Sequence, residues 1–339
     1  MERATRSLVT GGCGFVGRHL VEALRARGDE VRVLDVAASS PWQDVDYRRV
    51  DLSDAAAVEG TCEGMDVVFH NASLVHTRRN QIEKVWAVNL GGTEHMLDES
   101  RRAGVGKFVY VGSASAVYEG RDIENGDETL PYSSISQAPY ADSKIAAEKI
   151  ALGQDGEGGL HTCALRPHVI YGPHDNRLIP TMLQRARSGK LKYKVGNGGW
   201  LSDFTYVDNL VDALLLAEQA LGPEGKANGQ AYFITNGEPM QFFDFVAILL
   251  RLCGFPPTRG TVPYWLAYSV AAVKEFIDTL RGGDLNADQG VSRFAVKYLC
   301  THHYFSIDKA RRDLGYEPKV NIEEGLERTV AHLRETGAL

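Results

Sequence analysis

The feature that most constrains this chain is a glycine-rich turn near its N-terminus. It follows the apolar run at 7–10 and opens the amphipathic stretch at 15–28, and its glycines are spaced GxxGxxG. Such a turn between a strand and a helix lets the backbone approach a diphosphate, while free N–H groups at the start of the helix attract the negative charge. Glycine triplets also occur in purely structural turns. The residues that we expect to hold a dinucleotide here are Gly11, Gly14, Phe15, Val16 and Gly17.

Asp35 indicates which dinucleotide this turn favours. It ends the second apolar run, 18 residues after Gly17, and no arginine follows it at 36–40. A carboxylate at this point accepts hydrogen bonds from the adenosine ribose and repels a 2′-phosphate. We therefore predict NAD rather than NADP as the cofactor. The alternative is that Asp35 only caps a turn.

Short apolar runs alternate with helical patterns through the first half of the chain. Beyond the first run, they occupy 31–36, 66–73, 107–115 and 161–173. Strands at this spacing, connected by helices, predict an α/β fold with a parallel sheet and right-handed crossovers. We expect a doubly wound Rossmann domain at 1–172 that binds NAD. The less regular remainder, 173–339, is expected to be a smaller C-terminal substrate-binding region, partly interleaved with that core.

A tyrosine and a lysine four residues apart suggest acid–base chemistry. Tyr140 and Lys144 lie in a helical pattern, where residues at this spacing share one face. A neighbouring ammonium lowers the pKa of a phenol, so that it can exchange protons closer to neutral pH. Ser113, at the end of the apolar run at 107–115, is placed to hydrogen-bond the reacting oxygen, and Ser115 is the alternative. The pair alone is common, so the hypothesis rests on its combination with the glycine turn.

Composition excludes several other classes of function. The net charge is -7, from 37 basic and 44 acidic residues, which argues against a nucleic-acid surface. The five cysteines are dispersed without a CxxC pair, as is typical of reduced intracellular thiols, and no apolar leader or 18-residue apolar run is present. We expect a cytoplasmic protein without a metal site. The histidines considered as ligands, and interpreted instead as packed or surface residues, are His168, His174, His302 and His303.

Six segments in order resemble the motifs of the extended short-chain dehydrogenases. They are TGGCGFVG, HNAS, GSASAVY, PYADSK, LRPHVIYGP and SDFTYVDNLVDA, and they cover nearly the whole chain. The resemblance implies catalysis by Ser113, Tyr140 and Lys144, with the last two also at the cofactor. It further implies a homodimer formed through the helix that carries Tyr140. The other cofactor residues that it implies are Asp51, Leu52, Asn71, Ala72, Asn89, Pro167 and Val169.

The substrate is less constrained than the cofactor. Nucleotide-sugar members of this group often carry an arginine, which grips the diphosphate, where this chain has Ser202. A nucleotide-sugar epimerase is therefore disfavoured. The segment 262–280 is rich in aromatic and aliphatic residues, but Lys274, Glu275 and Asp278 interrupt it. It is expected to lie at a membrane surface or to cap a lipophilic pocket, with an ordinary core helix as the alternative.

Several longer stretches are similar to the sterol-4α-carboxylate 3-dehydrogenases (decarboxylating) of the 3β-hydroxysteroid dehydrogenase family. Among them are ALRPHVIYGPHDNRLIP and LCTHHYFSIDKARRDLGYEP. This resemblance implies oxidation of the 3β-hydroxyl of a 4-carboxysterol with loss of CO₂. The eukaryotic sterol enzymes have a more hydrophobic segment where this chain reads VKEFIDTL. This difference argues against firm membrane anchoring of this chain. The alternatives are an NAD(P)H-dependent reductase of long-chain 2-alkyl-3-ketoacids and a non-catalytic NAD-binding regulator.

Overall fold

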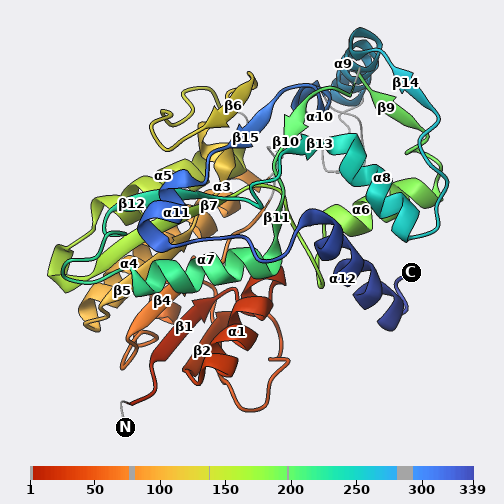
Figure 1. Cartoon of the computed structure of the whole chain (residues 1–339). Helices are drawn as coiled ribbons and strands as arrows, with labels where there is room; N and C mark the ends of the chain where they lie inside the picture. Colours follow the sequence, from red (N-terminus) through yellow and green to blue (C-terminus); the bar gives the residue numbers. More distant parts are fainter. Residues whose placement is uncertain (1–2, 76–80, 137, 197, 281–292) are drawn as a thin grey trace.

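A seven-stranded parallel sheet organises the part of the chain that the structure describes (Figure 1). The computed structural model describes residues 3–75, 81–136, 138–196, 198–280 and 293–339. The strand order is β12-β7-β5-β4-β1-β2-β3, and every neighbouring pair is parallel. The strands are β1 Arg6–Thr10, β2 Glu30–Asp35, β3 Asp46–Arg49, β4 Val67–His70, β5 Lys107–Val111, β7 His161–Pro167 and β12 Gln230–Ile234.

Helices cover both faces of this sheet. On one face α1 and α7 pack against Val9, and on the other α4 and α5 enclose Leu8. Successive side chains of a strand point to opposite faces, and both residues are fully buried. The predicted doubly wound α/β fold is therefore confirmed. The helices of these layers are α1 Phe15–Arg27, α2 Ala55–Val58, α3 Ile82–Trp86, α4 Gly92–Arg102, α5 Pro139–Gly153 and α7 Val207–Gln219.

The strand order reverses beside β1, because the chain runs outward through β2 and β3 and then returns to β4 on the other side of β1. Open α/β sheets bind ligands at such a point, outside the carboxyl ends of the strands. The glycine turn follows β1, Asn71 directly follows β4, and Ser113 follows β5. The topology thus brings three of the predicted site segments to one edge. The edge strand β3 was not among the predicted strands.

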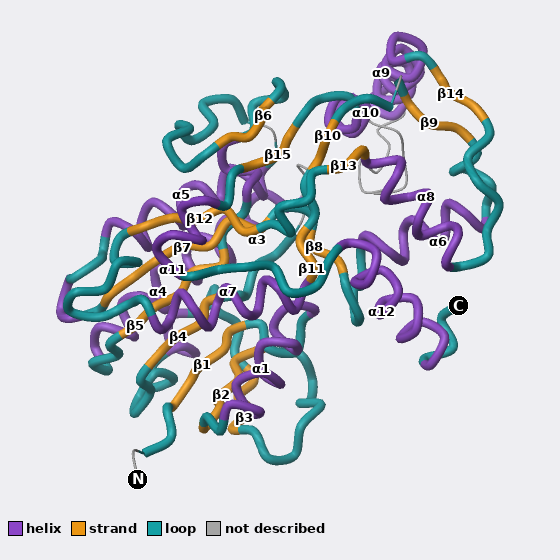
Figure 2. The backbone as a smooth tube through the Cα atoms, viewed as in Figure 1, coloured by secondary structure: helices purple, strands orange, loops and turns teal. Residues whose placement is uncertain are grey.

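The chain returns to the Rossmann layers after residue 172, through α7 and the edge strand β12. In the other direction β6 (Ile123–Gly126) leaves the first half and pairs with β15 in the four-stranded sheet β13-β10-β15-β6 (Figure 2). Elements are therefore exchanged across the predicted boundary at 172, which remains a prediction. The remaining elements are β8 Ile170–Tyr171, α6 Leu178–Arg187, β9 Tyr193–Val195, β10 Leu201–Ser202, β11 Thr205–Tyr206, β13 Met240–Gln241, α8 Phe242–Leu252, β14 Gly260–Val262, α9 Tyr264–Leu280, α10 Arg293–Leu299, β15 His303–Phe305, α11 Asp308–Leu314 and α12 Ile322–Glu335.

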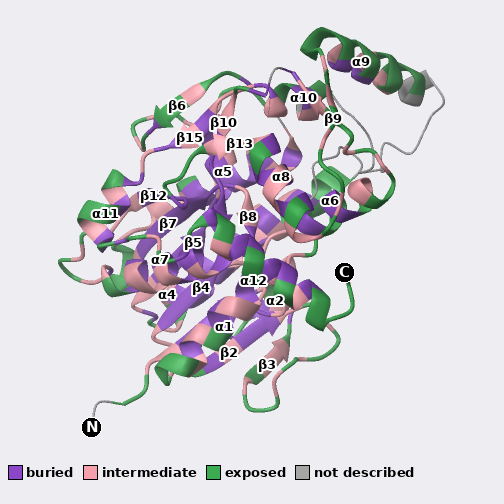
Figure 3. Cartoon of the chain, turned by 45° about the vertical axis from the view of Figure 1, so that its right-hand side comes forward, coloured by how far each residue is buried: buried purple, intermediate pink, exposed green. Residues whose placement is uncertain are grey.

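The helix α9 projects from the rest of the chain with little cover (Figure 3). Its inner face packs through Ala267 and Ala271 against Val296 of α10, in a small cluster separate from the main core. Its outer face is apolar and exposed, so the alternative interpretation of 262–280 as an ordinary core helix is not what the structure shows. No helix among the described residues is long and apolar enough to cross a membrane. The exposed apolar residues of α9 are Tyr264, Trp265, Leu266, Val270, Val273, Phe276 and Ile277.

Candidate active site

The glycine turn packs tightly between β1, α1 and the segment after β4. Gly11 adopts a left-handed backbone with φ +67°, and a Cβ added there would lie 2.9 Å from the Cα of Ala72. A Cβ on Gly17 would lie 2.1 Å from the carbonyl oxygen of Gly11. Both positions therefore exclude any larger residue, because backbone atoms cannot give way as a flexible side chain can.

The start of α1 is suited to a diphosphate. No side chain caps this helix at Gly14, so its first N–H groups remain available to an anion. Asp35 lies at the carboxyl end of β2 beside the turn, where its carboxylate accepts N–H bonds from Cys13 and Ala37, both at 2.9 Å. These residues fit a dinucleotide, with Phe15 and Val16 in the first helical turn. The assignment of each residue to the cofactor stays a prediction.

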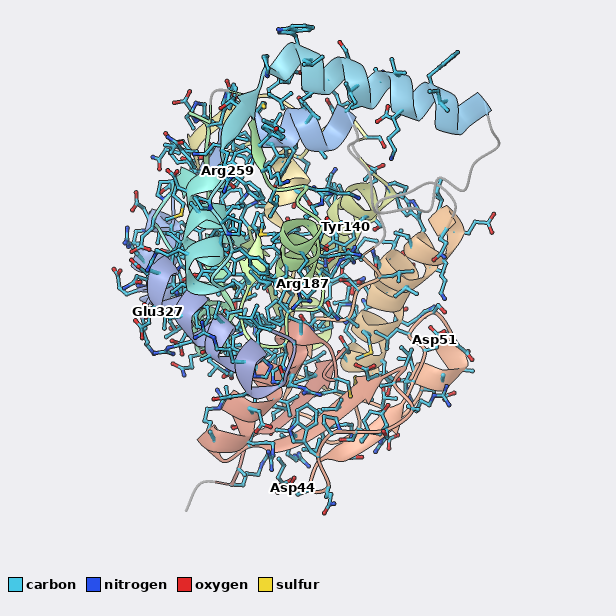
Figure 4. The ribbon with its side chains drawn as sticks, turned by 90° about the vertical axis from the view of Figure 1, so that its right-hand side faces the viewer. Asp44, Asp51, Tyr140, Arg187, Arg259 and Glu327 are labelled. Atoms are coloured by element: carbon cyan, nitrogen blue, oxygen red, sulfur yellow. The ribbon has the colours of Figure 1, made fainter. Side chains whose placement is uncertain are left out.

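Four further predicted cofactor residues take different positions. The side-chain amide of Asn71 lies 3.4 Å from the Gly11 carbonyl oxygen, and the Ala72 N–H donates to Thr10 at 3.0 Å. Both therefore adjoin the glycine turn. Leu52 is buried against α4, whereas Asp51 is exposed and accepts hydrogen bonds from Ser53. Figure 4 shows Asp51 well away from Tyr140.

Tyr140 lies in the first turn of α5, with its hydroxyl between two serines. Burial raises its pKa, and hydrogen bonding with Ser73 opposes this most strongly. The positive charge of Arg177 and hydrogen bonding with Ser113 also lower the pKa. The hydroxyl of Ser115 lies 2.8 Å from that of Ser113, and Ser113 accepts the N–H of Ser115. Ser113 is therefore the serine of this pair that acts on the phenol.

Lys144 follows Tyr140 by one helical turn and is almost wholly buried. Its ammonium donates a hydrogen bond to the Val111 carbonyl and lies 4.2 Å from the centre of the Tyr110 ring. Burial lowers the pKa of Lys144 to about 7, and the charge of Glu148 opposes this shift. The lysine is thus close to its protonation midpoint at neutral pH. Its predicted effect on the pKa of Tyr140 stays a prediction.

Asn89 connects the site to α5 from a π-helical segment, Ala87–Gly91. Its side-chain oxygen accepts the N–H of Leu74 at 2.6 Å, and its amide donates to the hydroxyl of Ser143 at 3.0 Å. Irregular helical turns of this kind often occur at functional sites. Asn89 therefore fixes the backbone next to Ser73 relative to the helix that carries Tyr140.

The end of β7 has a strained backbone. Pro167 is its last residue, and Val169 has φ +40°, which is rare for a β-branched side chain. Between them, Nε2 of His168 lies 2.8 Å from Nδ1 of His303. Burial lowers the pKa of His303 to about 4 and that of His168 well below its usual value, so both rings are neutral at pH 7.

Ser202 occupies the position at which nucleotide-sugar enzymes often carry an arginine. It is almost wholly buried, and its hydroxyl lies 3.0 Å from Nδ1 of His303. Of the other two histidines, Nδ1 of His302 accepts the N–H of Leu201, next to Ser202, whereas His174 lies beside Arg18. Ser202 therefore belongs to a neutral buried cluster, to which no arginine of the described residues contributes a guanidinium.

Two residues near Tyr140 were not predicted. Ser73 ends the quoted motif HNAS, and its position after β4, next to the end of β5, could have indicated it. Arg177 comes from the loop before α6, and nothing local in the sequence connects it with Tyr140. The structure adds both to the predicted group of Ser113, Tyr140 and Lys144.

Comparisons with known proteins agree with this geometry. A sequence model described as "3-beta hydroxysteroid dehydrogenase/isomerase family" matches residues 8–263. The sterol-4-alpha-carboxylate 3-dehydrogenase, decarboxylating, of Mus musculus is 36% identical over 338 residues, covering 98% of this chain and 93% of the relative. The 2-alkyl-3-oxoalkanoate reductase of Stenotrophomonas maltophilia is 37% identical over 328 residues, covering 96% and 98%. The UDP-glucose 4-epimerase of Thermus thermophilus, solved with NAD, is 28% identical with a TM-score of 0.72, covering 99% and 100%.

Proposed function

The chain belongs to the 3-beta hydroxysteroid dehydrogenase/isomerase family, and from this premise we propose that it oxidises the 3β-hydroxyl of a 4-carboxysterol to the 3-ketone, with loss of the carboxyl group as CO₂. The observation that carries the proposal is the similarity to the mouse sterol enzyme, which extends over 98% of the chain. It is an enzyme acting on a CH–OH group, with NAD as its cofactor. The glycine turn, the uncapped start of α1 and Asp35 support that cofactor.

Tyr140 is the acid–base group in this proposal. Its phenolate takes the proton from the 3β-hydroxyl, while Ser113 orients the reacting oxygen. NAD, when bound, supplies the acceptor for the hydride from C3. Lys144 would hold the ribose of the bound cofactor, and its ammonium would favour the ionised phenol. The new ketone is β to the carboxylate, so its carbonyl accepts the electron pair released as CO₂ departs.

The test offers purified protein and NAD⁺ a panel of 4-carboxysterols and long-chain 2-alkyl-3-hydroxyacids. NADH and CO₂ are followed together. The expected result is equal formation of both from a 4-carboxysterol. NADH formation without CO₂, or no turnover of any carboxysterol, would count against the sterol proposal.

A reductase of long-chain 2-alkyl-3-ketoacids is the second candidate. The observation that favours it is the similarity to the Stenotrophomonas reductase, which covers 98% of that relative. The same three groups would work in reverse, with Tyr140 as the acid. Faster NADH or NADPH oxidation with a 2-alkyl-3-ketoacid than any sterol oxidation would select this function.

Two other functions have less support. A nucleotide-sugar epimerase needs a grip on a diphosphate, and Ser202 is buried against a neutral histidine. Tight binding of UDP in calorimetry would nevertheless favour it. A non-catalytic NAD-binding regulator has no need for a tyrosine set between two serines, and the similarity to dehydrogenases argues against it.

We also propose that α9 contacts a membrane surface from which the lipophilic substrate is taken. Its exposed outer face includes Trp265 and Phe276, which are 67% and 65% accessible. The exposed cations Lys192 and Arg259 precede the paired strands β9 and β14, whose last residues, Val195 and Val262, pack against α9. An apolar face beside cations suits an anionic bilayer. Co-sedimentation with phosphatidylserine vesicles, lost in Trp265→Ser/Phe276→Ser, tests this; equal sedimentation of both proteins would contradict it.

A homodimer formed through α5 is proposed from the family resemblance. Lys149 is exposed on this helix, while Lys144 and Glu148 face inward. Light scattering after size exclusion measures the molecular mass of the protein in solution. Lys149→Glu places a charge of opposite sign on the exposed face of α5 and should shift that mass toward the monomer. A monomeric mass for the unmodified chain would contradict the dimer.

A further inference from the structure

Arg177 is held near Tyr140 by its backbone and by one side-chain contact. It precedes α6, and the carboxylate of Asp175 accepts the N–H groups of Arg177, Leu178 and Ile179. Its guanidinium donates a hydrogen bond to the Val75 carbonyl oxygen at 2.5 Å. Val75 is two residues beyond Ser73, which hydrogen-bonds Tyr140. The guanidinium therefore lies against the segment that approaches the phenol.

The charge of Arg177 is only partly balanced within the described part of the chain. Its side chain is exposed and forms no ion pair there, and the charge of the nearby Asp175, whose carboxylate caps α6, interacts with it at longer range. A guanidinium has five N–H donors, and the bond to Val75 uses one of them. The remaining donors can bind a planar anion in a bidentate manner. The positive charge is felt at the hydroxyl of Tyr140, whose pKa it lowers.

We propose that Arg177 binds the carboxylate of the substrate while Tyr140 acts on the hydroxyl or ketone oxygen of the β-carbon. In a β-hydroxy acid the two groups are attached to adjacent carbons, so a cation beside the base meets the carboxylate. This inference rests on the proposed function, because it requires a substrate that is a β-hydroxy or β-keto acid. Both the 4-carboxysterol and the 2-alkyl-3-ketoacid satisfy that requirement, whereas a simple 3β-hydroxysteroid does not. Arg177 thereby selects for acids within a family fold.

The test compares Arg177→Gln with the unmodified enzyme on two matched sterols. One carries the 4-carboxyl group and the other carries a 4-methyl group in its place. Glutamine keeps a polar N–H donor on a shorter side chain but has no charge. The expected result is a fall of about 10- to 100-fold in kcat/KM for the acid, mainly through KM, with little change for the methyl sterol. Arg177→Lys should recover part of the loss, and Arg185→Gln, within α6, serves as the matched control.

Binding of the acid to the NADH complex is measured as well, because no oxidation occurs there and the result is independent of turnover. Weaker binding of the acid in Arg177→Gln supports the proposal. Equal losses on both sterols would show that Arg177 only anchors the segment at Val75, and unchanged kinetics would exclude contact with the carboxylate. If the enzyme turns over only 2-alkyl-3-ketoacids, the sterol function fails, and Arg177 is tested on that acid against its methyl ester.

Discussion

The carboxylate of Glu148 accepts two hydrogen bonds from the guanidinium of Arg166, at 2.9 and 2.6 Å, and both side chains are almost wholly buried. Glu148 lies one helical turn beyond Lys144, so this ion pair connects β7 with the helix that carries the catalytic groups. The negative charge of Glu148 also raises the pKa of Lys144, against the effect of burial. The pair therefore contributes to packing and to the electrostatics of the site.

Removing one partner of this pair should be costly. Arg166→Met leaves the Glu148 carboxylate buried, and the Tyr132 hydroxyl is then its one remaining donor among the described side chains. We expect the free energy of unfolding to fall by about 3–5 kcal/mol, as measured by urea denaturation. The double variant Glu148→Met/Arg166→Met should lose less, because no unpaired charge remains. A larger loss in the double variant than in Arg166→Met would contradict this account.

Replacing the tyrosine tests the chemistry directly. Tyr140→Phe removes the hydroxyl and keeps the ring, so kcat should fall by about 10²- to 10⁴-fold. NADH affinity, followed by fluorescence, should change little because the glycine turn is untouched. Retention of most of the activity would rule out Tyr140 as the acid–base group.

The most reliable predictions from the sequence concerned local features. The unit β1–turn–α1 is contiguous, and its apolar run, glycines and helical period all fall within 7–28. The family resemblance, the fold and the NAD cofactor were also predicted from contiguous motifs, and all three are confirmed. The strand β3 was missed because its residues, DYRR, form no apolar run at the edge of the sheet.

Features that depend on distant parts of the chain were harder to predict. β6 pairs with β15, which lies far away in sequence, and the stretch at 123–126 alone gives no sign of that partner. Arg177 reaches the site only because the loop before α6 passes over Val75. Ser73 was more accessible to prediction, since the carboxyl ends of neighbouring parallel strands meet at one edge.

The two serines should have separable effects on catalysis. Ser73→Ala removes the hydrogen bond that opposes burial most strongly, so the pKa of Tyr140 should rise. In the oxidation direction, the midpoint of the pH–rate profile should therefore move to higher pH. Activity should recover at high pH. Ser113→Ala should instead lower kcat at every pH, because it also loses contact with the substrate. Identical profiles for the two variants would contradict separate roles.

Asp35 should govern the choice of cofactor. Asp35→Asn keeps an acceptor oxygen for only one of the two N–H groups, those of Cys13 and Ala37, and loses the charge that repels a 2′-phosphate. We expect kcat/KM with NAD to fall by about 10- to 100-fold and the ratio of NADP to NAD activity to rise. Thermal denaturation shows whether the turn is intact. A preference of the unmodified enzyme for NADP would overturn the assignment.

Asp203 should make stability depend on pH. Its Oδ2 accepts the N–H of Phe305 at 2.7 Å, while Oδ1 is buried without a partner among the described residues. Burial raises the pKa of Asp203 to about 7, whereas an unfolded aspartate titrates near ~3.9. Between these values the folded state holds a proton that the unfolded state has lost. The contribution of Asp203 to stability is therefore present at low pH and is lost as the pH rises toward 7.

Asp203→Asn removes this titration and keeps an oxygen for the Phe305 N–H. From pH 4 to 7, the free energy of unfolding of the unmodified chain should fall relative to the variant by up to about 1.4 kcal/mol per pH unit. Urea denaturation at a series of pH values measures the difference. Asp208→Asn is the matched control with the opposite sign, because hydrogen bonding with His19 helps to lower the pKa of Asp208. Parallel pH dependence of the unmodified chain and Asp203→Asn would show that Asp203 is already ionised in the folded protein.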